Sequence, residues 1–322
     1  MKVNLSHILR KFMLVSGIFL LLVVLVIAAW ATYQHLRDPL AALDRGSPDL
    51  RVVRQHAYPV ALEDENRTYI DFTLSAEGLD SLRITVSLPA HPVPDGIPSL
   101  VILGGLEIGR ESLQYVPAHG SNALIAYEYP YSPRYWYDGT PLTQVPVIRQ
   151  SVLKVPAQVE AVLRWALQQP WSDHQRISLL GYSFGAMFVP AVNHLAASHQ
   201  SPPAATVIAY GGADIFRLLK ANFKFLPPLP RYAVAWLAST AIQPVEPEAH
   251  LPHMQGTFLV INGKQDHQIP QNCWKKLQSL TPEPKTVMVL DAGHMNPAKP
   301  DLTRKLVTIS RQWLLDLNAI NP

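Results

Sequence analysis

The chain has 322 residues, of which 48% are hydrophobic and 16% are charged, and its formal net charge at pH 7 is +3. A chain of this length can bury a full core, and it accommodates one domain of roughly 250–280 residues with an appendage. Its basic residues are scattered rather than clustered, which argues against a nucleic-acid partner. The single cysteine, Cys273, excludes a disulfide framework and a cysteine-based metal site.

The amino end carries a long apolar segment without charged residues, residues 12–32. About 20 apolar residues span a bilayer as a helix. Because Arg10 and Lys11 precede the segment, the positive-inside rule predicts a cytoplasmic tail over residues 1–11 and places the rest of the chain across the membrane. The A-x-A pattern at 29–31 also fits a cleaved signal peptide. The apolar stretch is longer than a usual signal core, which favours a retained signal-anchor. Both interpretations put the remainder outside the cytoplasm, in the periplasm or the extracellular space.

Residues 33–64 are mixed and polar, with Pro39, Gly46 and Pro48, and they predict a linker or stalk. The domain that follows, 65–322, opens with two segments in which apolar and polar residues largely alternate. These segments, 67–74 and 82–88, predict half-exposed antiparallel strands.

The pattern then changes to near-continuous apolar runs, which are typical of parallel strands buried on both faces. Segments with helical periodicity lie between several of the runs. Strands that alternate with helices indicate βαβ units and a mostly parallel sheet. The predicted strands are 100–103, 123–127, 177–180, 205–210, 257–261 and 286–290, and the predicted helices are 155–167, 184–197 and 302–317.

Residues 213–250 interrupt this alternation with several aromatic residues and a Pro227-Pro228-Leu229-Pro230 run. We interpret them as an insertion. The sequence is compatible with two roles for it: a small lid over a site, or a long surface segment that packs its own aromatic residues.

The motif Gly181-Tyr182-Ser183-Phe184-Gly185 directly follows the predicted strand 177–180 and precedes a predicted helix. This G-x-S-x-G pattern is typical of a strained strand-to-helix turn that exposes a serine hydroxyl, and the flanking glycines allow close approach of neighbouring backbone. In such a turn the Phe184 amide points toward a developing oxyanion.

A serine hydroxyl needs a neighbouring base to become a nucleophile, and the base needs an orienting acid. His294 follows the last apolar run, and Asp266 follows the preceding one. Catalytic groups of parallel sheets gather at the carboxyl ends of the strands, where Ser183 also lies. Asp214, after the run 205–210, is the alternative acid.

Together, the segments 176–186, 263–270 and 292–294 resemble the α/β-hydrolases, in the branch of dienelactone hydrolases, acyl esterases and prolyl-oligopeptidase-like enzymes. The chain order Ser, Asp, His is the order of that fold. The resemblance covers about residues 65–318. It implies a mostly parallel, eight-stranded sheet flanked by helices, with Ser183 as nucleophile, His294 as general acid/base and Asp266 as its orienting acid.

The resemblance also implies an oxyanion hole with a second backbone donor in the loop after strand 100–103. Many relatives carry His-Gly where this chain has Gly104-Gly105. By alignment with that motif the donor is the Leu106 amide, which would act together with the Phe184 amide. The absence of this histidine affects the expected geometry of the loop but not the type of donor, which is a backbone amide in both cases.

The expected function is hydrolysis of carboxylic esters through an acyl-enzyme, with a small-molecule acyl ester as substrate and no cofactor or metal. His250 and His253 lack an evident third ligand. Two alternatives remain: a peptidase or amidase with the same triad, and a non-catalytic, membrane-tethered binding module.

Overall fold

The computed structural model describes residues 5–46, 48–63, 65–91, 96–105, 108–136, 138–296 and 300–322. The chain divides into two units, Met1–Asp38 and Pro39–Pro322. The first unit contains helix α1 (Leu5–Leu36). Among the described helices, α1 alone is long and apolar enough to cross a membrane, and its most apolar 18 residues have a mean hydropathy of 3.0. A signal sequence has the same character.

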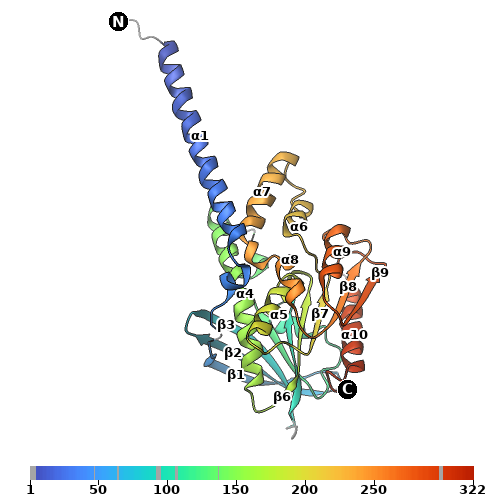
Figure 1. Ribbon diagram of the computed structural model, residues 1–322. Helices are drawn as coiled ribbons and strands as arrows, with labels where there is room; N and C mark the ends of the chain where they lie inside the picture. Colours follow the sequence, from blue (N-terminus) through green and yellow to red (C-terminus); the bar gives the residue numbers. More distant parts are fainter. Residues whose placement is uncertain are drawn as a thin grey trace. The chain divides into compact units, whose positions relative to one another are not determined.

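Within the described residues of the second unit, nine strands form one sheet in the order β1-β2-β3-β5-β4-β6-β7-β8-β9 (Figure 1). The first three strands and the β3–β5 pair are antiparallel, and the remaining neighbours are parallel. The strands are β1 (Arg51–Ala61), β2 (Asn66–Ala76), β3 (Leu79–Pro89), β4 (Ile97–Leu103), β5 (Ala123–Glu128), β6 (Ser172–Tyr182), β7 (Ala205–Ala209), β8 (Thr257–Gly263) and β9 (Lys285–Leu290).

The sheet has nine strands and not the expected eight, and the additional strand is β1. It lies inside the expected linker 33–64. Strand β1 pairs with β2 along most of its length, with Ala57 opposite Ile70. It escaped the sequence analysis because most of its residues are exposed on the edge of the sheet, so no apolar alternation marks it. The short helix α2 (Pro39–Leu43) also falls in that range, and it buries Leu43 completely.

The parallel strands at the centre are almost wholly buried, as their continuous apolar runs predicted. Strand β4 lies between β5 and β6, and its last residue, Leu103, is in register with Gly181 of β6. This register brings the loop after β4 next to the end of β6. The two oxyanion donors were expected at these two places.

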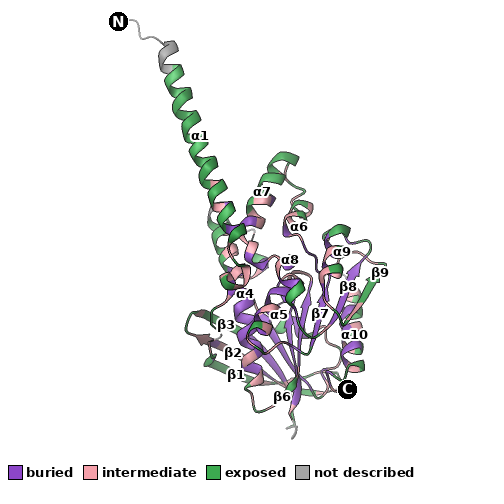
Figure 2. Cartoon of the chain, viewed as in Figure 1, coloured by how far each residue is buried: buried purple, intermediate pink, exposed green. Residues whose placement is uncertain are grey.

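Helices cover both faces of the sheet and enclose two apolar cores (Figure 2). Helices α4 and α5 pack on one face, and α10 with the short α3 packs on the other. Helix α4 begins at Pro141 rather than at the expected 155, although it contains two internal prolines. The remaining helices of the second unit are α3 (Arg110–Leu113), α4 (Pro141–Leu167), α5 (Val189–Ser198), α6 (Ile215–Asn222), α7 (Pro228–Ala241), α8 (Pro247–His250), α9 (Gln271–Leu280), α10 (Pro300–Asp316) and the 3₁₀ helices η1 (Pro133–Tyr135), η2 (Ser183–Met187), η3 (Gln243–Val245) and η4 (Leu251–His253).

The expected insertion 213–250 is a helical excursion between β7 and β8. Its helices α6 and α7 pack against each other as a hairpin that projects beyond the sheet (Figure 1). The Pro-rich run provides the turn of the hairpin and the first turn of α7, where proline is tolerated because the first amides of a helix have no partner within it.

Candidate active site

The turn between β6 and η2 holds Ser183 in an unusual backbone conformation. Its φ is +52°, a left-handed value that only a few per cent of non-glycine residues adopt. Gly185 is required beside it, because a Cβ atom there would lie 2.7 Å from the carbonyl carbon of Leu103. A Cβ on Gly181 would lie 2.9 Å from the Cα of Ala186. The strained serine and the two tight glycines are the arrangement that the G-x-S-x-G motif predicted.

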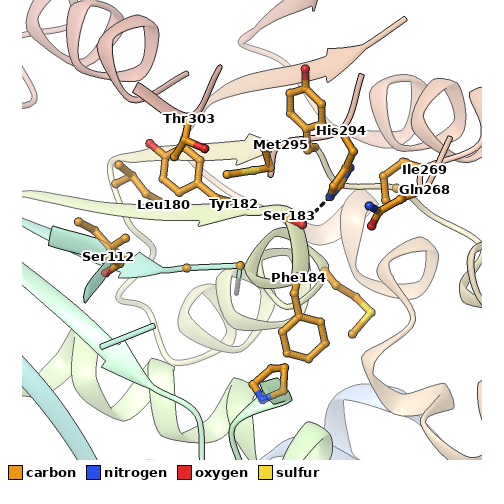
Figure 3. A pocket seen from close by; sticks show the side chains of 18 of the residues that line it. Ser112, Leu180, Tyr182, Ser183, Phe184, Gln268, Ile269, His294, Met295 and Thr303 are labelled. Atoms are coloured by element: carbon orange, nitrogen blue, oxygen red, sulfur yellow. Dashed lines mark hydrogen bonds between the residues drawn. The ribbon is translucent and has the colours of Figure 1, made fainter. Parts of the chain in front are cut away.

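The structure brings three of the expected site residues into one chain of hydrogen bonds. The Ser183 Oγ lies 2.7 Å from the His294 Nε2 (Figure 3), and the His294 Nδ1 lies 2.6 Å from an Asp266 carboxylate oxygen. Because an ionised carboxylate only accepts, the proton of the neutral imidazole belongs on Nδ1. The Nε2 is then free to accept from the serine hydroxyl.

Asp266 is held firmly at the carboxyl end of β8. Its second carboxylate oxygen accepts hydrogen bonds from the backbone N–H groups of Gln268 and Ile269, at 2.7 and 3.0 Å. Its side chain is almost completely shielded from solvent. These bonds leave one oxygen directed at the imidazole.

The alternative acid, Asp214, has other partners. It caps helix α6 by accepting from the Arg217 N–H at 3.0 Å, and its other oxygen lies 3.0 Å from the Arg217 guanidinium. Asp214 follows β7, the neighbour of β8, so the sequence placed both aspartates at the correct edge of the sheet. The geometry assigns the contact with His294 to Asp266.

Of the two expected oxyanion donors, the structure describes one. The Phe184 amide lies in the first turn of η2, where amides have no helical partner. Leu106 lies outside the described residues. The neighbouring Gly105 approaches Ser183 closely, since a Cβ atom on it would lie 3.1 Å from the serine Cβ. The loop after β4 therefore borders the nucleophile.

Tyr210, at the end of β7, contacts the site and was not singled out by the sequence analysis. Its ring meets the His294 ring edge-on, with centroids 5.5 Å apart. Burial and the nearby Asp266 carboxylate raise the pKa of its phenol to about 12. Its place directly after a buried strand was the available signal, but aromatic residues are common at such positions in cores.

A pocket of about 840 Å³ surrounds Ser183 and His294. The rings of Phe184 and Trp136 line this pocket, and Phe184 is at the centre of a cluster of aromatic rings from separate segments. Its ring packs edge-on against Trp136 at 5.1 Å and against Tyr129 at 5.2 Å, and the Tyr129 hydroxyl donates to the Gly104 carbonyl at 2.6 Å. Sequence patterns did not reveal this cluster because its members are distant along the chain.

The histidines at 250 and 253 lie elsewhere. His250 is buried, and its Nε2 lies 2.7 Å from the Pro244 carbonyl oxygen. The described part of the chain contains no group of three or more His, Cys, Asp or Glu side chains arranged to hold a metal ion. Cys273 is buried, and this burial raises the pKa of its thiol to about 12, which makes the thiol a poor nucleophile.

Comparisons with known proteins agree with this architecture. Residues 143–291 match the sequence model of the dienelactone hydrolase family. Acetyl xylan esterase 1 from a Thermoanaerobacterium species aligns with a TM-score of 0.59 at 14% identity, covering 87% of this chain and 92% of the esterase.

An acetyl xylan esterase from a Paenibacillus species aligns with the same TM-score, identity and coverage of this chain, and with 94% of its own length. A cold-adapted esterase from an Arctic intertidal metagenomic library aligns with a TM-score of 0.56 at 13% identity, covering 81% of this chain and 98% of that one. A search of curated proteins found no match. At these identities the structural likeness establishes the fold.

Proposed function

We propose that this chain, which has an α/β-hydrolase-like fold and matches the sequence model of the dienelactone hydrolase family over residues 143–291, is a serine hydrolase that cleaves carboxylic esters. The hydrogen-bonded chain from Ser183 through His294 to Asp266 carries the proposal. Its distances are those that proton transfer from a nucleophilic hydroxyl to a base requires.

In the proposed reaction Ser183 Oγ attacks the ester carbonyl while His294 Nε2 takes the hydroxyl proton. Asp266 stabilises the imidazolium that forms and keeps the ring in the correct orientation. His294 then protonates the alcohol oxygen as the C–O bond breaks. A water molecule, deprotonated by His294, hydrolyses the acyl-enzyme and restores the serine.

The tetrahedral oxyanion is assigned to backbone donors. The Phe184 amide at the start of η2 is one, and the Leu106 amide is proposed as the other. Such donors contribute most when they are fixed before the reaction. The packing of Phe184 between Trp136 and Tyr129, and the bond from Tyr129 to the Gly104 carbonyl, hold both flanks of this region in place.

We also propose that residues 12–32 anchor the enzyme in a membrane, with residues 1–11 in the cytoplasm and the hydrolase domain outside it. The apolar helix α1, and Arg10 and Lys11 just before the uncharged segment 12–32, support this arrangement. The reaction as proposed needs no cofactor or metal.

The test is the rate of p-nitrophenyl ester hydrolysis by the full chain, measured over a series of acyl lengths. Ser183→Ala is expected to reduce turnover to background, a loss of about 10⁶-fold by the magnitude typical of serine hydrolases, with little change in stability. Ser279→Ala removes a hydroxyl from an exposed position of α9 and serves as the matched control.

Turnover that survives Ser183→Ala would refute the assignment of the nucleophile. A folded protein that hydrolyses no ester but reacts with a fluorophosphonate at Ser183 would point to amide substrates. Absence of that reaction as well would favour a binding module.

A further inference from the structure

The α6–α7 hairpin exposes large apolar side chains that have little to pack against. Phe225 is 73% exposed and Leu229 is 82% exposed, and Tyr232 is also exposed. Figure 2 shows the tip of α7 as an exposed part of the second unit. We call these three residues, together with the exposed Val145 of α4, the apolar rim. Contiguous exposed apolar surface on a folded domain marks an interaction site.

Two of the four residues of the apolar rim border the pocket that contains Ser183. Phe225 and Val145 both line this pocket while their side chains are largely exposed. The entrance is therefore bordered by the hairpin on one side and by the first turns of α4 on the other. A substrate that reaches Ser183 by this entrance passes over the apolar rim.

The charge of the hairpin complements an anionic surface. Residues 214–241 contain four basic side chains, namely Arg217, Lys220, Lys224 and Arg231, and one acidic side chain, Asp214, which pairs with Arg217. The Lys220 ammonium lies 5.9 Å from the centre of the Tyr232 ring, which places a cation beside the apolar rim. Apolar side chains flanked by lysine and arginine are typical of protein surfaces that bind anionic phospholipid.

The second unit begins at Pro39, the residue that follows the unit containing the proposed membrane anchor. Helix α2 begins at Pro39, three residues after the last residue of α1, Leu36, and it packs against η3 and α4. The 3₁₀ helix η3 directly follows α7, and the Arg149 guanidinium of α4 donates to the Ala241 carbonyl at the end of α7 at 3.0 Å. The chain thus enters the domain beside the elements that border the pocket entrance.

We propose that the apolar rim docks on the surface of the bilayer in which α1 anchors the protein, and that the substrate is an amphiphilic ester dissolved in that bilayer. The substrate class rests on the proposed ester hydrolysis, whereas the docking does not. An ester that moves from the membrane over Phe225 and Val145 into a pocket of about 840 Å³ keeps its acyl chain away from water throughout.

The docking is tested on the full chain reconstituted in vesicles of equal parts phosphatidylcholine and phosphatidylglycerol. The only native cysteine, Cys273, is buried, so a nitrobenzoxadiazole label attaches selectively to Leu229→Cys. The matched control is Val53→Cys on β1, which is 64% exposed and lies at a distance from α7 in the second unit (Figure 1). We expect doxyl-labelled phosphatidylcholine to quench the label at 229 and not the label at 53. Equal quenching at both positions, or none at 229, would overturn the proposal and would indicate that the apolar rim binds a protein partner instead.

The substrate class is tested with two esters. Leu229→Glu is expected to slow hydrolysis of p-nitrophenyl palmitate dissolved in the vesicles by about tenfold, the scale of one lost leucine contact, and to leave soluble p-nitrophenyl acetate unaffected. Val53→Glu should change neither rate. Equal loss on both esters, or on neither, would contradict a membrane-borne substrate. Failure of the proposed function itself would show separately, as turnover that survives Ser183→Ala while the label at 229 is still quenched.

Discussion

The His294 imidazole is held from both sides, and each of its nitrogens has one partner. Asp266 Oδ2 engages Nδ1, Ser183 Oγ engages Nε2, and the edge-on contact with Tyr210 limits rotation of the ring. At this scale the sequence placed each residue at the end of a strand, but it did not decide which of two aspartates orients His294. Only distances could separate them, because Asp214 and Asp266 both follow buried parallel strands that are neighbours in the sheet.

Asp266→Asn is expected to lower ester turnover by about 10⁴-fold, because an amide in place of the carboxylate favours the wrong tautomer of His294 and no longer stabilises the imidazolium. Asp214→Asn is the matched control. It replaces the helix-capping aspartate, and turnover is expected to stay within a few-fold of the unmodified enzyme. The measurement is kcat and KM on one soluble ester for both variants. A larger loss in Asp214→Asn than in Asp266→Asn would reverse the assignment of the acid.

At the scale of elements, the site depends on how closely the turn after β6 packs against the end of β4. The sequence predicted the strand, the turn and the helical region after it. It did not predict that this region divides into η2 and α5, and a continuous helix over 184–197 was expected. Strand β1 was not predicted from the sequence, because its residues are mostly exposed and show no periodic pattern of apolar residues.

Gly185→Ala is expected to lower the free energy of unfolding by about 2 kcal/mol or more, because the new methyl group would collide with the Leu103 carbonyl and force the turn to move. Activity should fall with it, since Ser183 and Phe184 belong to that turn. Gly78→Ala is the comparison, because Gly78 has φ +76° but open space around it, and its cost should stay near 1 kcal/mol. Denaturant titration of both variants measures the difference. A cost for Gly185→Ala no larger than that of Gly78→Ala would show that the turn accommodates the methyl group and that the contact with β4 does not make Gly185 necessary.

At the scale of the whole domain, a buried polar cluster joins distant parts of the chain. The Arg67 guanidinium of β2 donates to the Gly120 and Asn122 carbonyls at 2.6 Å each, and the Asn122 side chain bonds to Asn321 near the carboxyl end. His119 is buried in this cluster, with its Nδ1 2.9 Å from the Ser87 hydroxyl. Burial and the Arg67 charge lower the pKa of His119 from 6.5 to about 4. Sequence patterns did not reveal the cluster because its members are far apart along the chain.

Because of His119, we expect the folded protein to lose stability at acidic pH. Between pH 6.5 and about 4 the unfolded chain binds a proton at His119 that the folded protein does not, so stability falls as pH falls through this window and is regained as pH rises. At pH 4 the loss is on the order of 3 kcal/mol. His119→Gln should make the free energy of unfolding less dependent on pH in this range, whereas the exposed His174→Gln should not. Denaturant titrations at pH 7.5 and 4.5 test this, and an unchanged slope in His119→Gln would disprove it.

The sequence by itself determined the class of fold, the central strands, the G-x-S-x-G turn, the apolar amino-terminal helix and the edge of the sheet where Ser183, Asp266 and His294 lie. These features depend on local patterns: runs of apolar residues, a glycine-flanked serine and the position of polar residues after strands. The tertiary structure decided which acid meets His294, added the ninth strand, and brought Tyr129, Trp136 and Tyr210 to the site. It also placed the exposed hairpin at the pocket entrance. These features depend on contacts between residues far apart in the chain, and such contacts leave no periodic signal in the sequence.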